Sequence, residues 1–147
     1  MVSEFKYVRR VEFSDTDMAG IMHFSRFFIF MESAEHAFFR SLGYSIHTRI
    51  GNQWYGWPRI KVECQYKHPL HFEDEVEIDL RVRDIGSKTL RYSFHFYKIN
   101  AEPRVLVAEG MLTVVCVVKG EGEKKFRSVS IPEEIRKQLE VYSEDSQ

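Results

Sequence analysis

The sequence contains few cysteines and no long apolar run. Its two cysteines, Cys64 and Cys116, have neither a CxxC partner nor a histidine at metal-site spacing, so we interpret both as buried free thiols. No stretch approaches the roughly 18 apolar residues of a membrane span, and residues 1–10 lack the pattern of a secretory signal. These absences argue against a disulfide framework and a transmembrane helix, and they predict a soluble, cytoplasmic protein without a membrane partner.

An excess of positive charge is also lacking. The 21 lysines and arginines are balanced by 22 aspartates and glutamates, which gives a formal net charge of −1. Proteins that bind nucleic acids generally carry a strong positive field, so no nucleic-acid partner is expected. A net charge near zero gives little resistance to self-association, and it therefore permits an oligomer.

Apolar and aromatic side chains, in contrast, are plentiful. Hydrophobic residues make up 44% of the 147 residues, and 12 of them are phenylalanines. This composition is enough for a real core or an apolar pocket in a chain of this length. No repeat, low-complexity tract or linker divides the sequence, so we expect a single domain over residues 1–147.

Hydrophobic spacing predicts a first strand and one long helix. Residues 5–13 alternate apolar and polar side chains, which is typical of a half-buried strand. From Ser25 to Leu42, apolar residues recur at three- and four-residue spacings, and Gly43 follows where helices often end. The apolar surface of this helix exceeds one stripe, so we expect other elements to wrap around it.

Several strands are expected after that helix. Alternation predicts one face in the core and one in water for the first three, and in the first the core face comprises Ile60, Val62, Cys64 and Tyr66. The strand at 105–118 differs, because residues 112–118 are apolar on both faces, as expected of an interior strand or one whose second face meets another subunit. The expected elements are strands at 59–67, 75–83, 90–98, 105–118 and 126–129, and a C-terminal helix at 131–141. Their order predicts an α+β fold in which a curved antiparallel sheet wraps around one long central helix.

Two close carboxylates, a glycine and a histidine lie between the first strand and the helix. The segment is Phe13-Ser14-Asp15-Thr16-Asp17-Met18-Ala19-Gly20-Ile21-Met22-His23-Phe24. A carboxylate in a turn beside a helix start has anion-stabilising backbone N–H donors within reach. The Asp15-Thr16-Asp17 triplet alone also suits an Asx-type turn. A metal site formed by Asp15, Asp17 and His23 is disfavoured, because no further strong ligand has a recognisable spacing.

These residues resemble the signature of a known family. The residues Phe13-Ser14-Asp15-Thr16-Asp17-x-x-Gly20, then His23-Phe24-Ser25-Arg26-Phe27-Phe28 and Leu42-Gly43, are similar to those of the 4-hydroxybenzoyl-CoA thioesterase-like acyl-CoA thioesterases, which have the hot-dog fold. The resemblance covers nearly the whole chain, including the strand order. It implies an acyl-CoA substrate, and two chains that extend one sheet and form active sites at their interface, as a homodimer or a homotetramer (dimer of dimers).

The resemblance also implies roles for individual residues. In such enzymes the last aspartate of the Asp-x-Asp turn is the catalytic carboxylate, and that position is Asp17. The backbone N–H near Phe24 is expected to face the thioester carbonyl oxygen. One common version of the motif has an aromatic residue followed by histidine, whereas this chain has His23 followed by Phe24. The resemblance therefore places His23 near the pocket but does not carry a catalytic role over to it.

A thioester needs a well-placed carboxylate more than a strongly activated nucleophile, because its thiolate leaves readily. Asp17 could attack the carbonyl carbon to form a mixed anhydride, or it could act as a general base on water, and the sequence does not separate the two. Unsatisfied N–H groups at the helix start would hold the developing oxyanion. Gly20 suits the close approach or unusual backbone angle in this loop. We expect neither a metal ion nor another cofactor.

Further site predictions concern the acyl pocket. Phe24 and Phe27, near the helix start, are expected to line it. Glu32 could point into this pocket or lie on a wet, ion-paired face of the helix with His36 and Arg40. Related enzymes that place a catalytic carboxylate on this helix make Glu32 and Glu35 the alternative catalytic candidates. Three large aromatics precede the next strand and are expected to cover the pocket mouth or a subunit contact: Trp54, Tyr55 and Trp57.

The CoA end of the substrate is predicted to lie elsewhere. The resemblance places contacts to the nucleotide phosphates at a turn between two strands, which here carries Ser87, Lys88 and Thr89. A cation and free hydroxyls suit phosphate binding. The alternative is an ordinary solvated hairpin.

The sequence therefore favours an acyl-CoA thioester hydrolase. The alternative is a non-catalytic hot-dog module that binds an acyl-CoA or an acyl carrier protein. Asp17 discriminates the two, because a pure binder needs no carboxylate beside a thioester. A hydratase acting on an enoyl thioester is less favoured, since the usual Asp-x-x-x-x-His helix pair is not evident. Acyl length, aromatic preference and the nature of the carrier stay open.

Overall fold

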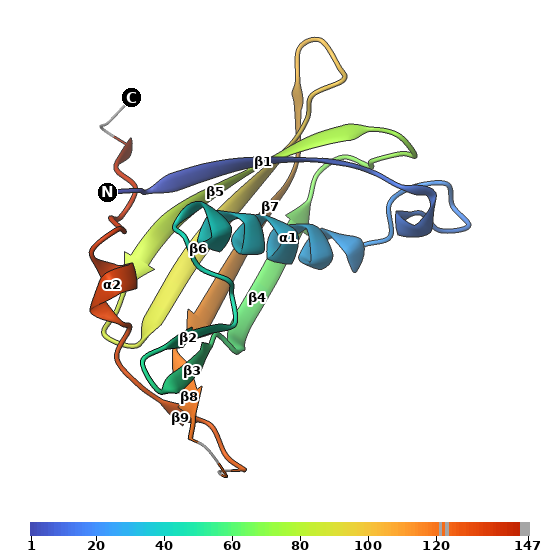
Figure 1. Cartoon of the computed structure of the whole chain (residues 1–147). Helices are drawn as coiled ribbons and strands as arrows, with labels where there is room; N and C mark the ends of the chain where they lie inside the picture. The colour runs from blue at the N-terminus through green and yellow to red at the C-terminus, as the bar shows by residue number, and fades with distance from the viewer. Residues whose placement is uncertain (121, 123, 145–147) are drawn as a thin grey trace.

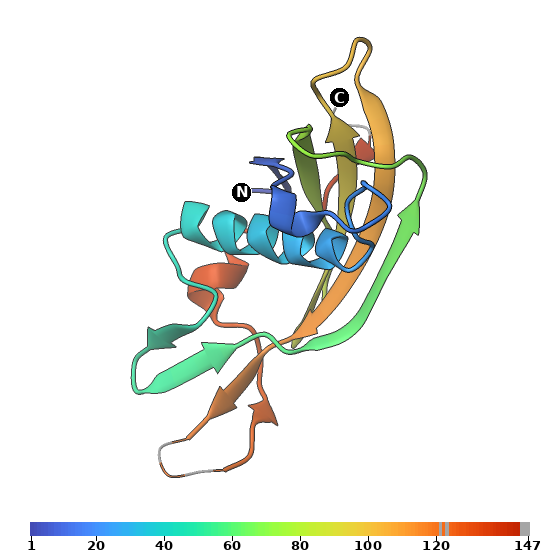
Figure 2. The same ribbon diagram turned by 90° about the vertical axis from the view of Figure 1, so that its right-hand side faces the viewer.

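The computed structural model describes residues 1–120, 122 and 124–144. In chain order the elements are β1 (Glu4–Arg10), the 3-10 helix η1 (Phe13–Asp15), α1 (Arg26–Ser41), β2 (Thr48–Ile50), β3 (Gln53–Gly56), β4 (Arg59–Tyr66), β5 (Glu75–Ile85), β6 (Thr89–Lys98), β7 (Val105–Val115), β8 (Val117–Lys119), β9 (Arg127–Ser128) and α2 (Glu133–Arg136). A curved sheet wraps around α1, which crosses its inner side (Figures 1 and 2). The α+β fold with one long central helix is thus confirmed.

The strands form two antiparallel sheets. The larger sheet has the order β1-β5-β6-β7-β4, and the smaller sheet has the order β2-β3-β8-β9. β4 does not pair with β5, which follows it in the chain, but with β7. The smaller sheet lies beyond the C-terminal end of α1, at the bottom of Figure 1.

The helix α1 forms where its apolar spacing predicts, within one residue at each end of the expected range of 25–42. Its buried face packs into the sheet through Phe27, Phe30, Met31 and Phe38, each at most 3% exposed. Gly43 follows with a φ of +93°, a left-handed conformation that ends helices and that glycine adopts without strain.

The inner face of the larger sheet supplies the other half of the core. Every inward residue of β5 and β6 is fully buried, as their alternation predicts: Val76, Ile78, Leu80, Val82, Leu90, Tyr92, Phe94 and Phe96. Removing this apolar surface from water, at about 25 cal/mol per Å², is the main force that holds α1 in the sheet.

The strand β4 differs from its neighbours. Its expected core face is largely open to solvent, since Ile60 is 59% exposed and Val62 and Tyr66 are each 45% exposed. The physical reason is that β4 is the edge strand of the sheet and curves away from α1 (Figure 2). The prediction that this face lies in the core of the single chain was therefore wrong.

Three further segments differ from the sequence prediction. The expected first strand at 5–13 ends at Arg10, and residues 13–15 form η1. The expected strand at 105–118 is divided at Cys116 into β7, in the larger sheet, and β8, in the smaller one. The expected helix at 131–141 is reduced to α2, because Val2 pairs with the segment beyond it. The N–H of Val2 donates to Gln138 O at 2.7 Å, and the N–H of Glu140 donates to Val2 O at 3.0 Å.

No helix in the described ranges is long and apolar enough to span a membrane.

Candidate active site

The two aspartates of the loop before α1 have different environments. Asp15 is only 2% exposed and fixes the local backbone, because its Oδ2 accepts the N–H of Glu12 at 2.9 Å. The Nε of Arg26 lies 3.8 Å from its Oδ1, and the N–H of His23 donates to its carbonyl oxygen at 2.9 Å. These contacts make Asp15 a support for the loop.

Asp17 lies in a tight turn of the same loop and is partly exposed. Its Oδ1 accepts the N–H of Ala19 at 2.9 Å, and its carbonyl oxygen accepts the N–H of Gly20, also at 2.9 Å. Gly20 has a φ of +83°, which glycine adopts without strain. The Asx-type turn is therefore present, yet it uses one carboxylate oxygen only. Within the described residues, Oδ2 of Asp17 has no hydrogen-bond partner.

The start of α1 lies beside this turn and has unused donors. The side chain of Ser25 makes no capping hydrogen bond to the helix, because its Oγ lies 2.8 Å from Nδ1 of His23. In the described part of the chain, the N–H of Phe24 has no acceptor. Free N–H groups at a helix start carry partial positive charge and attract an anion.

The turn and the helix start line one apolar cavity of about 470 Å³. One side is formed by Asp17, Ile21, Met22, Phe24 and Phe27, and the other side is formed by residues 66–69. The hydroxyl of Tyr66 donates to Phe24 O at 3.0 Å, and its ring meets that of Phe27 edge-on at 5.0 Å. A cavity of this size suits a small acyl group.

Two predicted site residues do not line this cavity. His23 turns toward Ser25 and stacks on Phe24 at 4.5 Å between ring centroids. Glu32 is 52% exposed and pairs with Arg59 at 3.2 Å. Of the two readings of Glu32, the geometry favours the ion-paired face, although its partner is Arg59 and not Arg40.

Glu35, a second carboxyl on this helix, was an alternative catalytic candidate, but its burial was not predicted from the sequence. Glu35 is fully buried and binds Arg59 through contacts of 2.5 and 3.3 Å. Arg59 also donates to Trp57 O at 2.8 Å. Burial raises the pKa of Glu35 from 4.5 to about 7, and the nearby Arg59 offsets only part of this effect. The pair joins the middle of α1 to the start of β4.

The turn with Ser87, Lys88 and Thr89 lies at the other end of the molecule. Arg136 donates to the carbonyl oxygens of Gly86 and Ser87 at 2.6 and 3.0 Å, and Gln138 donates to Leu42 O at 3.2 Å. The α2 segment thus lies against both the turn and the C-terminal end of α1 (Figure 1). The 16 residues of α1 span about 24 Å, so the predicted CoA contacts lie far from Asp17 of the same chain.

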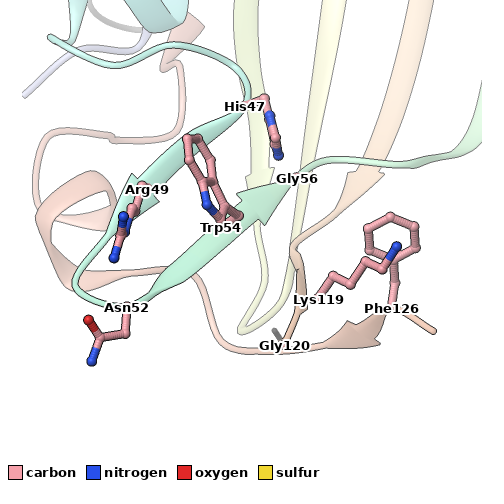
Figure 3. A pocket seen from close by; sticks show the side chains of 8 residues that line it. All are labelled: His47, Arg49, Asn52, Trp54, Gly56, Lys119, Gly120 and Phe126. Atoms are coloured by element: carbon pink, nitrogen blue, oxygen red, sulfur yellow. The ribbon is translucent and has the colours of Figure 1, made fainter. Parts of the chain in front are cut away.

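The three aromatics before β4 have different positions. Trp57 is 5% exposed and packs against Phe39, at 5.4 Å between ring centroids, so it belongs to the core. Trp54 is 47% exposed and lines a second cavity, of about 650 Å³, on the smaller sheet. We call this second cavity the small-sheet pocket; Figure 3 shows Trp54 within it, together with His47, Arg49, Asn52, Lys119 and Phe126.

The sequence analysis also missed the far wall of the cavity beside Asp17, formed by Tyr66, Lys67, His68 and Pro69. These residues lie more than 40 positions from Asp17 in the chain, and no local pattern links them to the loop. No group of three or more His, Cys, Asp or Glu side chains in the described ranges could hold a metal ion.

Comparison with known proteins defines the class of this chain. Residues 11–139 match the family described as the thioesterase-like superfamily. A protein of Aquifex aeolicus (strain VF5), provisionally named as an esterase, is 31% identical over 131 residues, which cover 89% of this chain and 94% of that protein. The chain therefore belongs to the thioesterase-like superfamily.

Solved structures confirm the fold. A gentisyl-coenzyme A thioesterase matches with a TM-score of 0.73 and 28% identity, over 90% of this chain and 99% of that chain. The 4-hydroxybenzoyl-CoA thioesterase from Pseudomonas sp. strain CBS-3 matches with a TM-score of 0.78 and 15% identity, over 92% of this chain and 99% of that chain. The resemblance noted in the sequence, and with it the hot-dog fold, is confirmed.

Proposed function

We propose that this protein hydrolyses an acyl-CoA thioester and that Asp17 is its catalytic residue. The observation that carries the proposal is the free Oδ2 of Asp17 in a turn that lines an apolar cavity beside the start of α1. Membership of the thioesterase-like superfamily supports thioester hydrolysis as the reaction. The likeness to gentisyl-coenzyme A thioesterase, at 28% identity, supports a CoA thioester as the substrate class.

The carboxylate of Asp17 would act either on the thioester carbon or on a water molecule. As a nucleophile it would form a mixed anhydride as the C–S bond breaks and the CoA thiolate leaves, and water would then hydrolyse the anhydride. As a general base it would remove a proton from the water that attacks the carbonyl carbon and displaces the thiolate. Either route puts negative charge on the carbonyl oxygen. The free N–H of Phe24 is the proposed donor to this oxygen, and the start of α1 adds its partial positive charge.

Hydrolysis of a panel of aliphatic and aromatic acyl-CoAs tests the proposal. We expect release of CoA by the natural chain, and a loss of roughly 10²–10⁴-fold in kcat in Asp17→Asn, which keeps the size of the side chain but removes the charge. Asp84→Asn, a change at an exposed carboxylate on β5, is the matched control and should leave kcat unaltered. Equal CoA release by the natural chain and Asp17→Asn would exclude Asp17 as the catalytic residue.

The same assay separates catalysis from binding alone. A module that only binds acyl-CoA would retain the labelled ligand in a filter assay without releasing CoA. In that case Asp17→Asn would not change the release rate, because there would be none above the uncatalysed background.

We further propose that two chains form each active site by pairing along β4. This edge strand exposes Ile60, Val62 and Tyr66, and its outer edge pairs with no strand in the described part of the chain. Its C-terminal residue Tyr66 lines the Asp17 cavity, whereas its N-terminal end leads back to Gly56 in the small-sheet pocket. Antiparallel pairing would bring the Asp17 end of one chain beside the opposite end of the other.

This pairing would explain why the turn with Lys88 lies so far from Asp17 of its own chain. The nucleotide phosphates of a CoA bound with its thioester at Asp17 would reach Ser87, Lys88 and Thr89 of the second chain. Measurement of the solution mass tests the assembly, with the charge substitution Val62→Lys on β4 as the variant. A mass of one chain for the natural protein at working concentration would rule the assembly out.

A further inference from the structure

The small-sheet pocket carries a regular row of side chains that the proposed hydrolysis does not use. Arg49 on β2 is the register partner of Trp54 on β3, and Trp54 is the register partner of Lys119 on β8. Continuing the register of β8 and β9 places Phe126 opposite Lys119. Partners in a sheet lie on the same face, about 5 Å apart, so cation and aromatic side chains alternate along this row.

The row is accessible. Trp54 is 47% exposed and Phe126 is 63% exposed, and both cationic side chains are exposed as well. In Figure 3, Trp54 stands between Arg49 on one side and Lys119 with Phe126 on the other. Large aromatics that remain exposed beside a cavity usually mark a binding surface.

The two cations of the row contact a carbonyl oxygen and an aromatic ring. Arg49 donates through its Nε to Gly51 O at 3.2 Å, and Lys119 lies over the Phe126 ring at 5.6 Å from its centroid. Neither forms an ion pair with a carboxylate of the described residues. Two positive charges without a carboxylate partner among the described residues, placed around an exposed indole, suit a planar ligand with attached anionic groups.

We propose that the small-sheet pocket binds an adenine nucleotide, with the base stacked on Trp54 and the phosphates held by Arg49 and Lys119. Its volume of about 650 Å³ suits a single nucleotide and not a longer polymer. His47 is already stacked on the indole, at 4.8 Å between ring centroids, and fixes the orientation of the platform. The stacking of bases on aromatic side chains tolerates any base, whereas the cations require the phosphates.

The nucleotide has two possible sources, the end of the CoA substrate and a free adenine nucleotide. The first rests on the proposed function, because pairing along β4 would bring the pocket of one chain beside the Asp17 cavity of the other. Lys119, the last residue of β8, also lies three residues after Cys116, whose N–H donates to Lys88 O in the predicted phosphate turn at 2.7 Å. Three residues of a strand span roughly 10 Å, which a nucleotide can bridge.

Calorimetric titration with 3′-phosphoadenosine 5′-diphosphate tests the site on the full chain without any turnover. Removing the platform in Trp54→Ala, or both charges in Arg49→Gln/Lys119→Gln, is expected to weaken binding about tenfold or more. Trp54→Phe keeps an aromatic face and should retain most of the affinity. Lys137→Gln, which neutralises an exposed cation beyond α2, should bind as the natural chain does.

Binding that is absent in the natural chain, or unchanged in both Trp54→Ala and the double variant while their melting temperatures are unaltered, would overturn the site. This result does not depend on hydrolysis, so it can be distinguished from failure of the proposed function. Kinetics then identifies the source. If the nucleotide belongs to CoA, the double variant raises KM for an acyl-CoA about tenfold and leaves KM for the matching acyl-pantetheine unchanged. An unchanged KM for acyl-CoA, with weakened nucleotide binding, supports a free nucleotide.

Discussion

The two ends of α1 have opposite chemistry. At its start, Asp17 and the free N–H of Phe24 lie beside an apolar cavity. Beyond its end lie exposed cations, Lys88 in a turn and Arg49 and Lys119 around Trp54. An acyl-CoA has the matching asymmetry, because its thioester is neutral until the reaction begins while its phosphates are always charged. Fixed backbone dipoles are suited to stabilise the transient charge of an oxyanion, and exposed side-chain cations are suited to bind permanently charged phosphates.

The largest expected effect on stability comes from breaking the ion pair between Glu35, in the middle of α1, and Arg59, at the start of β4. Removing Arg59 leaves the fully buried Glu35 without its partner, and such a loss typically costs about 3–5 kcal/mol of unfolding free energy. We expect this cost for Arg59→Ala in urea unfolding at pH 8. At pH 5 the cost should be smaller, because Glu35 is then protonated.

Arg10→Ala is the matched control, since it removes an exposed pair with Glu75 at 3.5 Å and should cost less than about 1 kcal/mol. Equal costs for Arg59→Ala at the two pH values would show that the charge of Glu35 does not set the effect.

The second effect concerns how the stability depends on pH. The pKa of Glu35 is raised in the folded state, from 4.5 to about 7, so the folded state holds this proton more tightly than the unfolded state. The contribution of Glu35 to the free energy of unfolding is therefore full below pH 4.5 and falls as the pH rises toward 7, by roughly 3 kcal/mol for such a shift. In Glu35→Gln most of this fall should disappear between pH 5 and 7.5.

A smaller slope should remain in Glu35→Gln, because burial also raises the pKa of Asp79, to about 6. A slope identical to that of the natural chain in urea midpoints would contradict the assignment to Glu35.

Two glycines allow a direct comparison of the Asp17 turn, before α1, with the β2–β3 turn of the smaller sheet. Gly20, in the Asp17 turn, and Gly51, between β2 and β3, have φ values of +83° and +63°, and neither has a heavy atom within 4 Å of an added Cβ. Alanine at either position should cost roughly 1–2 kcal/mol through backbone strain alone. Only Gly20→Ala should also lower kcat, about tenfold, because it displaces Asp17.

Steady-state kinetics and urea unfolding of both glycine variants provide the test. An equal loss of kcat in Gly51→Ala would mean that a change in the β2–β3 turn also affects the Asp17 turn.

The smallest effect on kinetics is expected at the turn with Lys88, which is predicted to contact the CoA phosphates. Lys88→Gln should raise KM for an acyl-CoA a few-fold and leave kcat unchanged, because an exposed cation contributes little binding energy. KM for the matching acyl-pantetheine, which lacks the nucleotide, should not change, and Lys137→Gln serves as the control cation. A fall in kcat without a rise in KM would instead place Lys88 in the catalytic step.

The sequence predicted the elements whose pattern is local. The spacing of apolar residues gave α1 to within one residue at each end, and alternation gave β5 and β6. The β2–β3 hairpin was missed although its signal was present, since Gly51-Asn52 is a two-residue turn between strands.

Features that depend on distant contacts were not predictable in the same way. The exposure of the apolar face of β4 follows from its edge position, and α2 is short because Val2 pairs beyond it. At the site, the loop with Asp17 was found by its residue types, but Tyr66 and the rest of the far wall come from another part of the chain. The burial of Glu35 depends on Arg59, 24 positions away, and has no local signature.

The exposed edge of β4 has a consequence for the register in which two chains would meet. In an antiparallel pair of β4 strands related by a two-fold axis, a residue before the axis faces a residue of the second chain that lies equally far after it. The charges on the outer face of β4 then favour one register over another. If the two-fold axis passes beside Val62, Lys61 lies opposite Glu63 of the second chain, and the symmetry produces this pair twice. If the axis passes beside Glu63, this residue lies opposite Glu63 of the second chain, and the two negative charges repel each other. The charge pattern therefore favours the alignment about Val62, which also uses almost the full length of the strand.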